Sequence, residues 1–197
     1  MYSQYNEEEH VISAVMNSGK VEPGRFLDIG AWDPKTFSNT RALYDRGWQG
    51  VCIEPSPGPV LNLLREYGDD PCITIIQAAV MPAAGLLSMH ISDDAISTSS
   101  ETEYEKWKNH AKFLGKLVVP AITLEDIAAQ FGGFDVINFD AEGISAELFL
   151  HAMDLGWQPK CVIVEHDERT TQIMTRASQC HYHIVYANST NLVLVRR

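Results

Sequence analysis

Hydrophobic positions along the chain fall into two alternating patterns, short continuous apolar runs and longer segments with helical spacing. In the segment 5–17, within a predicted N-terminal helical region 1–20, Val11, Ile12 and Val15 lie at helical spacing and Gly19 follows as a stop. Later segments with the same periodicity predict helices at 39–47, 59–67, 123–131, 145–156 and 169–179. The apolar runs predict strands at 25–29, 50–55, 72–80, 134–140, 160–167, 181–187 and 190–197.

The order of these elements predicts the fold class. Strands alternate with helices over most of the chain, which favours a parallel sheet with helices on both faces. The last two strands flank the turn "NST" at 188–190, so they form a hairpin and one of them runs antiparallel to the rest. We therefore predict one α/β domain over 1–197, with a Rossmann-like, mostly parallel, seven-stranded sheet. Seven strands with a terminal hairpin resemble the class I methyltransferase architecture, and this resemblance implies the strand order 3-2-1-4-5-7-6.

One segment breaks the alternating pattern. Residues 86–91 predict an additional strand, but 92–116 is polar, rich in Ser and Thr, and weakly patterned. Long irregular insertions in compact domains are usually lids or mobile loops. We therefore expect 92–116 to be a lid or insertion that closes over a ligand site.

Composition narrows the function classes. The chain has 197 residues, 45% of them hydrophobic, which is ordinary for one globular domain. No apolar run approaches the roughly 20 residues of a membrane span, and the acidic start "MYSQYNEEEH" does not resemble a signal peptide. A formal net charge of −11 disfavours binding to phosphate backbones. We expect a cytoplasmic protein that binds neither membrane nor nucleic acid, and its oligomeric state stays open.

The cysteines and histidines suggest little specific chemistry. Cys52, Cys72, Cys161 and Cys180 form no CxxC pair, so we expect reduced thiols and no structural zinc. In "HYH" at 181–183, strand alternation would place both histidines on one face. Weak metal binding there is one interpretation, and a plain surface pair is the favoured one.

Candidate ligand-binding residues follow the first predicted strand, because ligands of open α/β sheets bind beyond the carboxyl ends of the strands. Asp28, Gly30 and Asp33 lie there, and glycine lets the backbone approach a ligand closely. The next helix begins near Ser38, and its free N–H groups would suit a carboxylate. Asp28 or Asp33 would accept from an ammonium group, so an amino-acid zwitterion fits this turn better than a pyrophosphate.

The second and third strands end in residues that fit a nucleoside. Glu54 ends the second strand, where a carboxylate can accept from both ribose hydroxyls, at about 1.5–3 kcal/mol for each bond. Gln77 and Ala78 end the third strand, where an amide beside small residues could read an adenine edge. Adenine, ribose and an amino-acid end together describe S-adenosylmethionine.

Candidate catalytic residues follow the fourth and fifth strands. "NFDAEG" at 138–143 would place Asp140 and Glu142 beside the reactive end of the ligand, because the fourth strand lies next to the first. Two such carboxylates can orient a hydroxyl, act as general base or hold a divalent cation. His166, in "VEHDE" after the fifth strand, is a further proton acceptor near neutral pH. Turn capping or exposure to solvent is the alternative reading of each residue.

Several motifs together resemble the FkbM-type methyltransferase family over roughly residues 24–195, among them "FLDIGAWDP", "FSNTRALYDRGWQG", "VCIEP", "TLEDI", "FDVINFDAEG" and "TNLVLV". The resemblance implies a Rossmann-like fold, S-adenosylmethionine as methyl donor, and transfer mostly to hydroxyl oxygens of sugars or natural products. It implies the following site residues: Asp28, Gly30 and Ala31 at the methionine end of the donor, Glu54 and Pro55 at its ribose, and Asp140 to Glu142 on the reacting side.

We therefore predict an S-adenosylmethionine-dependent methyltransferase that acts on a hydroxyl oxygen of a sugar, glycan or other small-molecule acceptor. A nicotinamide-dependent oxidoreductase is one alternative, since Glu54 would suit its ribose equally well. Trp32 counts against it, because this bulky residue stands where a dinucleotide loop has its second glycine. A non-catalytic cofactor-binding protein of the same fold is the other alternative.

Overall fold

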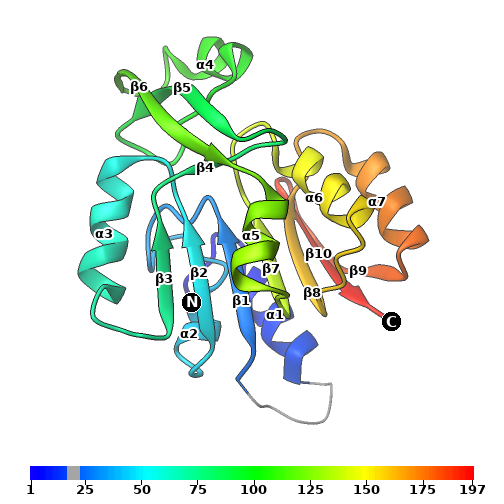
Figure 1. Ribbon diagram of the computed structural model, residues 1–197. Helices are drawn as coiled ribbons and strands as arrows, with labels where there is room; N and C mark the ends of the chain where they lie inside the picture. The colour runs from blue at the N-terminus through cyan, green and yellow to red at the C-terminus, as the bar shows by residue number, and fades with distance from the viewer. Residues whose placement is uncertain (17–22) are drawn as a thin grey trace.

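The computed structural model describes residues 1–16 and 23–197, which form a large central sheet with a smaller sheet above it (Figure 1). The main sheet contains β1 (Arg25–Ile29), β2 (Gln49–Ile53), β3 (Ile73–Ile76), β7 (Val136–Phe139), β8 (Cys161–Glu165), β9 (Tyr182–Ala187) and β10 (Asn191–Arg196). The smaller sheet contains β4 (Ala79–Val80), β5 (Gly85–Ser92) and β6 (Phe113–Ile122). The helices are α1 (Glu7–Met16), α2 (Arg41–Tyr44), α3 (Pro57–Tyr67), α4 (Glu101–Trp107), α5 (Leu124–Phe131), α6 (Ser145–Asp154) and α7 (Thr170–Gln179).

The main sheet has the predicted topology. Its seven strands follow the order β3-β2-β1-β7-β8-β10-β9, which is 3-2-1-4-5-7-6 when they are numbered along the chain. Neighbouring strands from β3 to β8 are parallel, whereas β10 is antiparallel to both β8 and β9. The order reverses between β1 and β7, so a crevice is expected above the carboxyl ends of these two strands.

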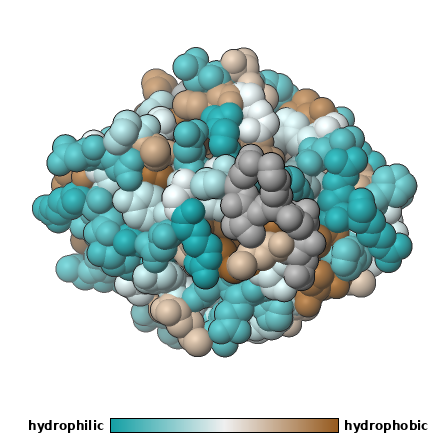
Figure 2. All heavy atoms as spheres, turned by 90° about the horizontal axis from the view of Figure 1, so that it is seen from below, coloured by the Kyte–Doolittle hydropathy of each residue, from teal (hydrophilic) through white to brown (hydrophobic). Residues whose placement is uncertain are grey.

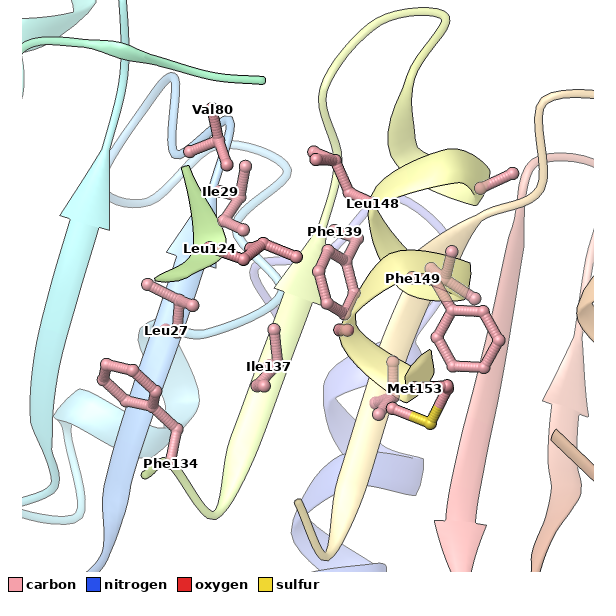
Figure 3. Close-up of a cluster of buried hydrophobic side chains, with 14 of the residues drawn as sticks. Leu27, Ile29, Val80, Leu124, Phe134, Ile137, Phe139, Leu148, Phe149 and Met153 are labelled. Atoms are coloured by element: carbon pink, nitrogen blue, oxygen red, sulfur yellow. The ribbon is translucent and has the colours of Figure 1, made fainter. Parts of the chain in front are cut away.

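Alternation along the strands builds a hydrophobic core on each face of the sheet. Leu27 and Ile29 of β1 pack on one face with Ile137 and Phe139 of β7, under α5, α6 and α7 (Figure 3). Phe26 points to the other face, which α1, α2 and α3 cover. Full burial of each such side chain contributes about 1.5–3 kcal/mol. The prediction of helices on both faces is confirmed.

Two predicted elements are shorter than expected. The predicted strand 72–80 breaks after Ile76, and the chain leaves the main sheet to form β4 in the smaller one. The predicted helix 39–47 is only the single turn α2. Asn39 and Thr40 are buried, and their side chains bond to neighbouring strands instead of extending the helix.

The segment 92–116, which we expect to be a lid or insertion, contains more regular structure than its weak pattern indicates. It contains the end of β5, all of α4 and the start of β6. Ser100 caps α4 by accepting from the backbone N–H of Glu103. His90 of β5 stacks on Tyr104 of α4 at 3.8 Å between ring centroids and lies 3.0 Å from a carboxylate oxygen of Glu101. Contacts between rings on separate elements hold this region, and a search for periodicity cannot detect them.

The two histidines of "HYH" do not share a face. His181 precedes β9 and has φ 66, so strand alternation does not extend to it, and only His183 belongs to the strand. Gly19, the predicted helix stop, lies outside the described residues. The cysteines are free thiols, and Cys52 and Cys161 are buried in the sheet.

The surface at one end of the molecule is mostly hydrophilic. Figure 2 shows the end of the molecule below the amino ends of the parallel strands, where hydrophilic residues cover most of the visible face. Among the residues described, no helix is long and apolar enough to cross a bilayer.

Candidate active site

Two adjoining cavities lie beyond the carboxyl ends of β1, β2 and β7. The larger has a volume of about 820 Å³, and the smaller about 60 Å³. Gly30, Trp32, Ala95, Asp140 and Glu142 line both, so these residues form the border between the cavities. The cavities therefore meet at the crevice that the strand order predicts.

Asp28 lies on the floor of the larger cavity and connects three parts of the fold. It is only 3% exposed, and its carboxylate accepts from Thr40 Oγ1 at 2.5 Å and from Asn138 Nδ2 at 2.8 Å. Asn39 Nδ2 in turn donates to Asn138 Oδ1. Burial raises the pKa of Asp28, and the two donors oppose that rise. The carboxylate thus joins β1 to β7 and to the loop before α2.

Gly30 is required at the start of the β1 loop for a reason that the sequence did not show. Its φ is 81, and a Cβ there would lie 1.8 Å from the carbonyl oxygen of Asp140. The Asp140 N–H also donates to the carbonyl of Ile29 at 2.9 Å. The loops after β1 and β7 therefore touch through backbone atoms, and only glycine allows this approach.

Glu54 ends β2 beside the smaller cavity, as predicted. It is 5% exposed, and its two oxygens accept from the backbone N–H groups of Trp32 at 3.2 Å and Ser56 at 2.7 Å. Burial raises its pKa, and these hydrogen bonds oppose the rise. A carboxylate oxygen has two lone pairs, so each oxygen can still accept a ligand hydroxyl. Pro55 lines the same cavity.

The smaller cavity combines apolar walls with a few polar groups. Ala78, Ala79 and Met81 line it from the β3–β4 region, and the hydroxyl-bearing segment 97–99 lines it from the smaller sheet. Gln77 is exposed and lines neither cavity. Small side chains beside a buried carboxylate suit a flat base attached to a ribose.

Asp33 and Ser38 bond to their own loop. Asp33 Oδ1 accepts from the backbone N–H groups of Lys35 and Thr36, and Asp33 lines neither cavity. Ser38 does line the larger cavity, as Ala31 does, and its Oγ accepts from the N–H of Arg41. The helix α2 is a single turn with Thr40 as its N-cap, and Ser38 already takes up the N–H of Arg41, so the start of α2 offers a ligand fewer free N–H groups than the sequence predicted.

Asp140 and Glu142 form an interacting pair at the border of the cavities. Burial and the Glu142 carboxylate raise the pKa of Asp140 to about 7. Burial, together with Glu103 and Asp167, raises the pKa of Glu142 to about 7 as well. No hydrogen bond from the described part of the chain reaches either carboxylate. At neutral pH the pair can therefore both hold and release a proton.

Two further carboxylates follow β8. Burial and repulsion from Asp140, Glu142 and Asp167 raise the pKa of Glu165 to about 9, so this group holds its proton at neutral pH. Burial also raises the pKa of Asp167, whose Oδ2 accepts from the N–H of Ala146 at 2.9 Å. The wall of the larger cavity at the ends of β7 and β8 is therefore crowded with acidic groups.

His166 lines the larger cavity between these two acids. Its backbone N–H donates to the carbonyl of Thr190 at 2.8 Å, which fixes its position beside the β9–β10 turn. Its ring Nδ1 is buried and has no hydrogen-bond partner in the described residues. The imidazole is therefore held by its backbone and retains a free ring nitrogen.

Sequence reasoning missed several residues of the larger cavity. Glu103, Lys106 and Trp107 reach it from α4, and Gln4 and Asn191 reach it from the two ends of the chain. Nothing in their local patterns marks them, because each comes from a segment far in sequence from the strand ends. Within the described ranges, no group of three or more His, Cys, Asp or Glu side chains is arranged to hold a metal ion.

The residues present fit S-adenosylmethionine. The lining of the smaller cavity, a carboxylate beside small apolar walls, has the chemistry that suits adenosine, and Gly30 and Trp32 border both cavities; at about 60 Å³ the smaller cavity must widen to admit a nucleoside. The larger cavity continues past Asp140 toward β8 and the smaller sheet, which leaves room for a second molecule. The arrangement can hold a nucleoside-containing donor and an acceptor side by side.

Comparison with known proteins agrees with this reading. A family described as the methyltransferase FkbM domain matches residues 28–184. No curated protein matches the chain. A methyltransferase FkbM from Methylobacillus flagellatus has a similar structure, with TM-score 0.56 and 14% identity over 98% of this chain and 56% of that one. Monomeric WbdD has TM-score 0.51 and 13% identity over 98% of this chain and 41% of its own. This chain therefore spans about half of each structure, and at such identities the likeness shows the fold.

Proposed function

The chain belongs to the FkbM family of S-adenosylmethionine-dependent methyltransferases, and on this basis we propose that it methylates a hydroxyl oxygen of a small-molecule or glycan acceptor. The observation that carries the proposal is the Asp140–Glu142 pair at the border between the cavities. Its pKa values of about 7 are close to the optimum for a general base working near neutral pH.

The donor supplies a methyl group on a sulfonium sulfur, so the protein must align an oxygen nucleophile and remove its proton. Glu54 and the Gly30 loop hold and orient the nucleoside end. Asp140 or Glu142 would accept the hydroxyl proton while the oxygen displaces the methyl group: the C–O bond forms as the C–S bond breaks, the sulfur keeps the electron pair and leaves as a neutral thioether, and the proton then passes to solvent. Positioning of this kind can contribute roughly 7–11 kcal/mol to lowering the barrier.

The charge of the larger cavity supports the choice of acceptor. Carboxylates from α4, β8 and the loop after β7 face it, while Lys106 and Arg169 are the cations among its lining residues. Such a wall repels phosphates and favours donors of hydrogen bonds, such as sugar hydroxyls. We therefore propose a hydroxyl-rich acceptor and no nucleic acid. The free cysteines support a reducing compartment, for which we propose the cytoplasm.

Transfer of a radiolabelled methyl group tests the proposal. The protein is incubated with labelled S-adenosylmethionine and a panel of glycosides, polyols and phenols, and products are identified by mass spectrometry. We expect a methyl ether on a hydroxyl oxygen. Tight donor binding by calorimetry without transfer to any member of the panel would instead favour a non-catalytic binding protein.

A further inference from the structure

Residues 1–16, called here the amino-terminal segment, precede the region matched by the family, 28–184, yet Gln4 of this segment lines the larger cavity. Gln4 is exposed at the cavity wall. Glu7, three residues later, is 0% exposed although it is a charged residue in the first turn of α1. A buried carboxylate is costly unless donors surround it, so its partners indicate what it is for.

Glu7 binds the turn between β9 and β10. Its Oε1 accepts from Asn188 Nδ2 at 2.7 Å and from Asn191 Nδ2 at 2.9 Å, and its Oε2 accepts from the N–H of Tyr5 at 2.9 Å. One carboxylate therefore fixes both the backbone next to Gln4 and the turn on the opposite end of the chain.

The β9–β10 turn connects Glu7 to His166 and to the lining of the larger cavity through hydrogen bonds. Asn188 Oδ1 accepts from the N–H groups of Thr190 at 2.8 Å and Asn191 at 2.7 Å. The carbonyl of Thr190 accepts from the N–H of His166. Thr190, Asn191 and His166 all line the larger cavity, so Glu7 is connected to the acceptor side through hydrogen bonds alone.

The segment is also fixed independently of Glu7. Tyr186 Oη donates to the carbonyl of Tyr5 at 2.7 Å, and Glu8 accepts from the N–H groups of Tyr2 and Ser3 at 2.6 and 2.8 Å. These bonds hold the backbone on both sides of Gln4. These hydrogen bonds therefore fix Gln4 in place in the wall of the larger cavity.

Glu7 also acts on the catalytic pair through its charge. Burial raises its pKa, but donation from Asn191, from the backbone N–H groups of Glu7 and Tyr5, and from Asn188 together outweighs burial and leaves the pKa below its usual value, so the carboxylate is ionised. After burial, Glu142 and Asp28, the Glu7 charge is a further cause that raises the pKa of Asp140.

We infer that the amino-terminal segment is part of the acceptor site, with Gln4 as a specificity-determining residue and Glu7 as a positioning residue for the turn and His166. The inference rests on the proposed hydroxyl methylation. The Gln4 amide both donates and accepts hydrogen bonds, which suits a hydroxyl of the acceptor away from the reacting oxygen.

Three variants test the inference in the full chain: Gln4→Ala, Glu7→Gln and, as control, Glu9→Gln, an exposed acid on the same helix. Steady-state kinetics use the best hydroxyl acceptor of the wild-type panel, with donor affinity from calorimetry. We expect Gln4→Ala to raise acceptor KM at least fivefold, with kcat and donor Kd unchanged. Glu7→Gln should raise acceptor KM and move the acidic limb of the kcat/KM profile to lower pH, because Asp140 loses a nearby negative charge. Glu9→Gln should match wild type.

The possible results distinguish failure of this inference from failure of the proposed hydroxyl methylation. Acceptor KM within twofold of wild type for both Gln4→Ala and Glu7→Gln, with an unmoved acidic limb, overturns the inference and leaves hydroxyl methylation intact. If Glu7→Gln does not fold, Gln4→Ala decides alone, because its side chain is exposed. If wild type methylates no hydroxyl at all, the proposed function fails and the inference fails with it.

Discussion

The donor side and the acceptor side of this site both use buried carboxylates at strand ends, but they treat them differently. Asp28 and Glu54 on the donor side each receive two hydrogen bonds from the protein. Asp140 and Glu142 on the acceptor side receive none from the described residues and repel one another. The first pair maintains the shape of the site, and the second pair is left to react with what binds there.

Each pair of carboxylates therefore has a different role that offsets the free-energy cost of its burial. A carboxylate with bonded donors is stable in place and positions loops, as Asp28 does for β1, β7 and the loop before α2. A carboxylate without donors is stabilised by a proton, which is the property that a general base near neutral pH requires.

Replacing the reactive carboxylate should have the largest effect. We expect Asp140→Asn to lower kcat about 100- to 10,000-fold, because an amide cannot take up the hydroxyl proton. Donor Kd should change by less than about threefold, because the Asp140 side chain bonds no donor-side group in the described residues. Methyl-transfer kinetics and calorimetry measure the two quantities, with exposed Asp69→Asn as control. A kcat within tenfold of wild type would assign proton removal to Glu142 or His166 instead.

Replacing Glu54 on the donor side should instead weaken donor binding and leave kcat nearly unchanged. Glu54→Gln loses charged acceptors for the Trp32 and Ser56 N–H groups and for the ribose, so donor Kd should weaken about 10- to 100-fold. At saturating donor, kcat should stay within a few-fold of wild type. Calorimetric titration checks this, with exposed Glu147→Gln as the matched control. An unchanged Kd would remove Glu54 from the donor site.

The buried Glu165 carboxylate, repelled by its acidic neighbours, should lower thermal stability at high pH. Because folding raises the pKa of Glu165 from 4.5 to about 9, the folded state holds this proton more tightly than the unfolded chain. Stability therefore falls as pH rises between these values. Glu165→Gln removes that loss, so we expect it to raise Tm by roughly 2–4 °C at pH 8, about 1 kcal/mol, and hardly at all at pH 4. Thermal melts at both pH values measure the difference, and an equal shift at both would contradict the assigned cause.

The smallest effect is expected at Asp33. Its carboxylate accepts from the N–H groups of Lys35 and Thr36, so Asp33→Ala should cost about 0.5–1.5 kcal/mol of stability. Donor Kd should stay unchanged, because Asp33 lines neither cavity. Calorimetry decides between this expectation and the sequence-based one, under which Asp33 accepts from the ammonium group of the donor and its loss weakens binding.

The donor side was largely predictable because its residues stand at fixed offsets from buried strands. Alternating apolar runs locate β1 and β2, and the residues just beyond them, Gly30 and Glu54, line the cavities. Local patterns could not show that Asp33 would be used by its own turn. They also could not show that the chain leaves the main sheet after β3, which leaves Gln77 exposed.

The acceptor side was less predictable, because tertiary contacts assemble it. Asp140 and Glu142 followed from the strand order, but Trp107, Gln4 and Asn191 come from α4, the amino-terminal segment and β10. The stacking of His90 on Tyr104 holds α4 and with it Trp107, while the hydrogen bonds from Asn191 to Glu7 and from Tyr186 to Tyr5 hold the other two. No spacing rule within one segment encodes such a contact.

The way the chain enters and leaves the smaller sheet has a consequence for how such enzymes diversify. β4 carries the chain in and β6 carries it out, and the two are paired side by side at Ala79 with Ala121 and at Val80 with Ile122. An insertion whose ends are neighbours can be exchanged without moving the elements that flank it. The region 79–122 supplies Met81 to the wall of the smaller cavity and Lys106 to the wall of the larger one, so exchanging it would change both cavities while leaving β1, β2 and β7 in place.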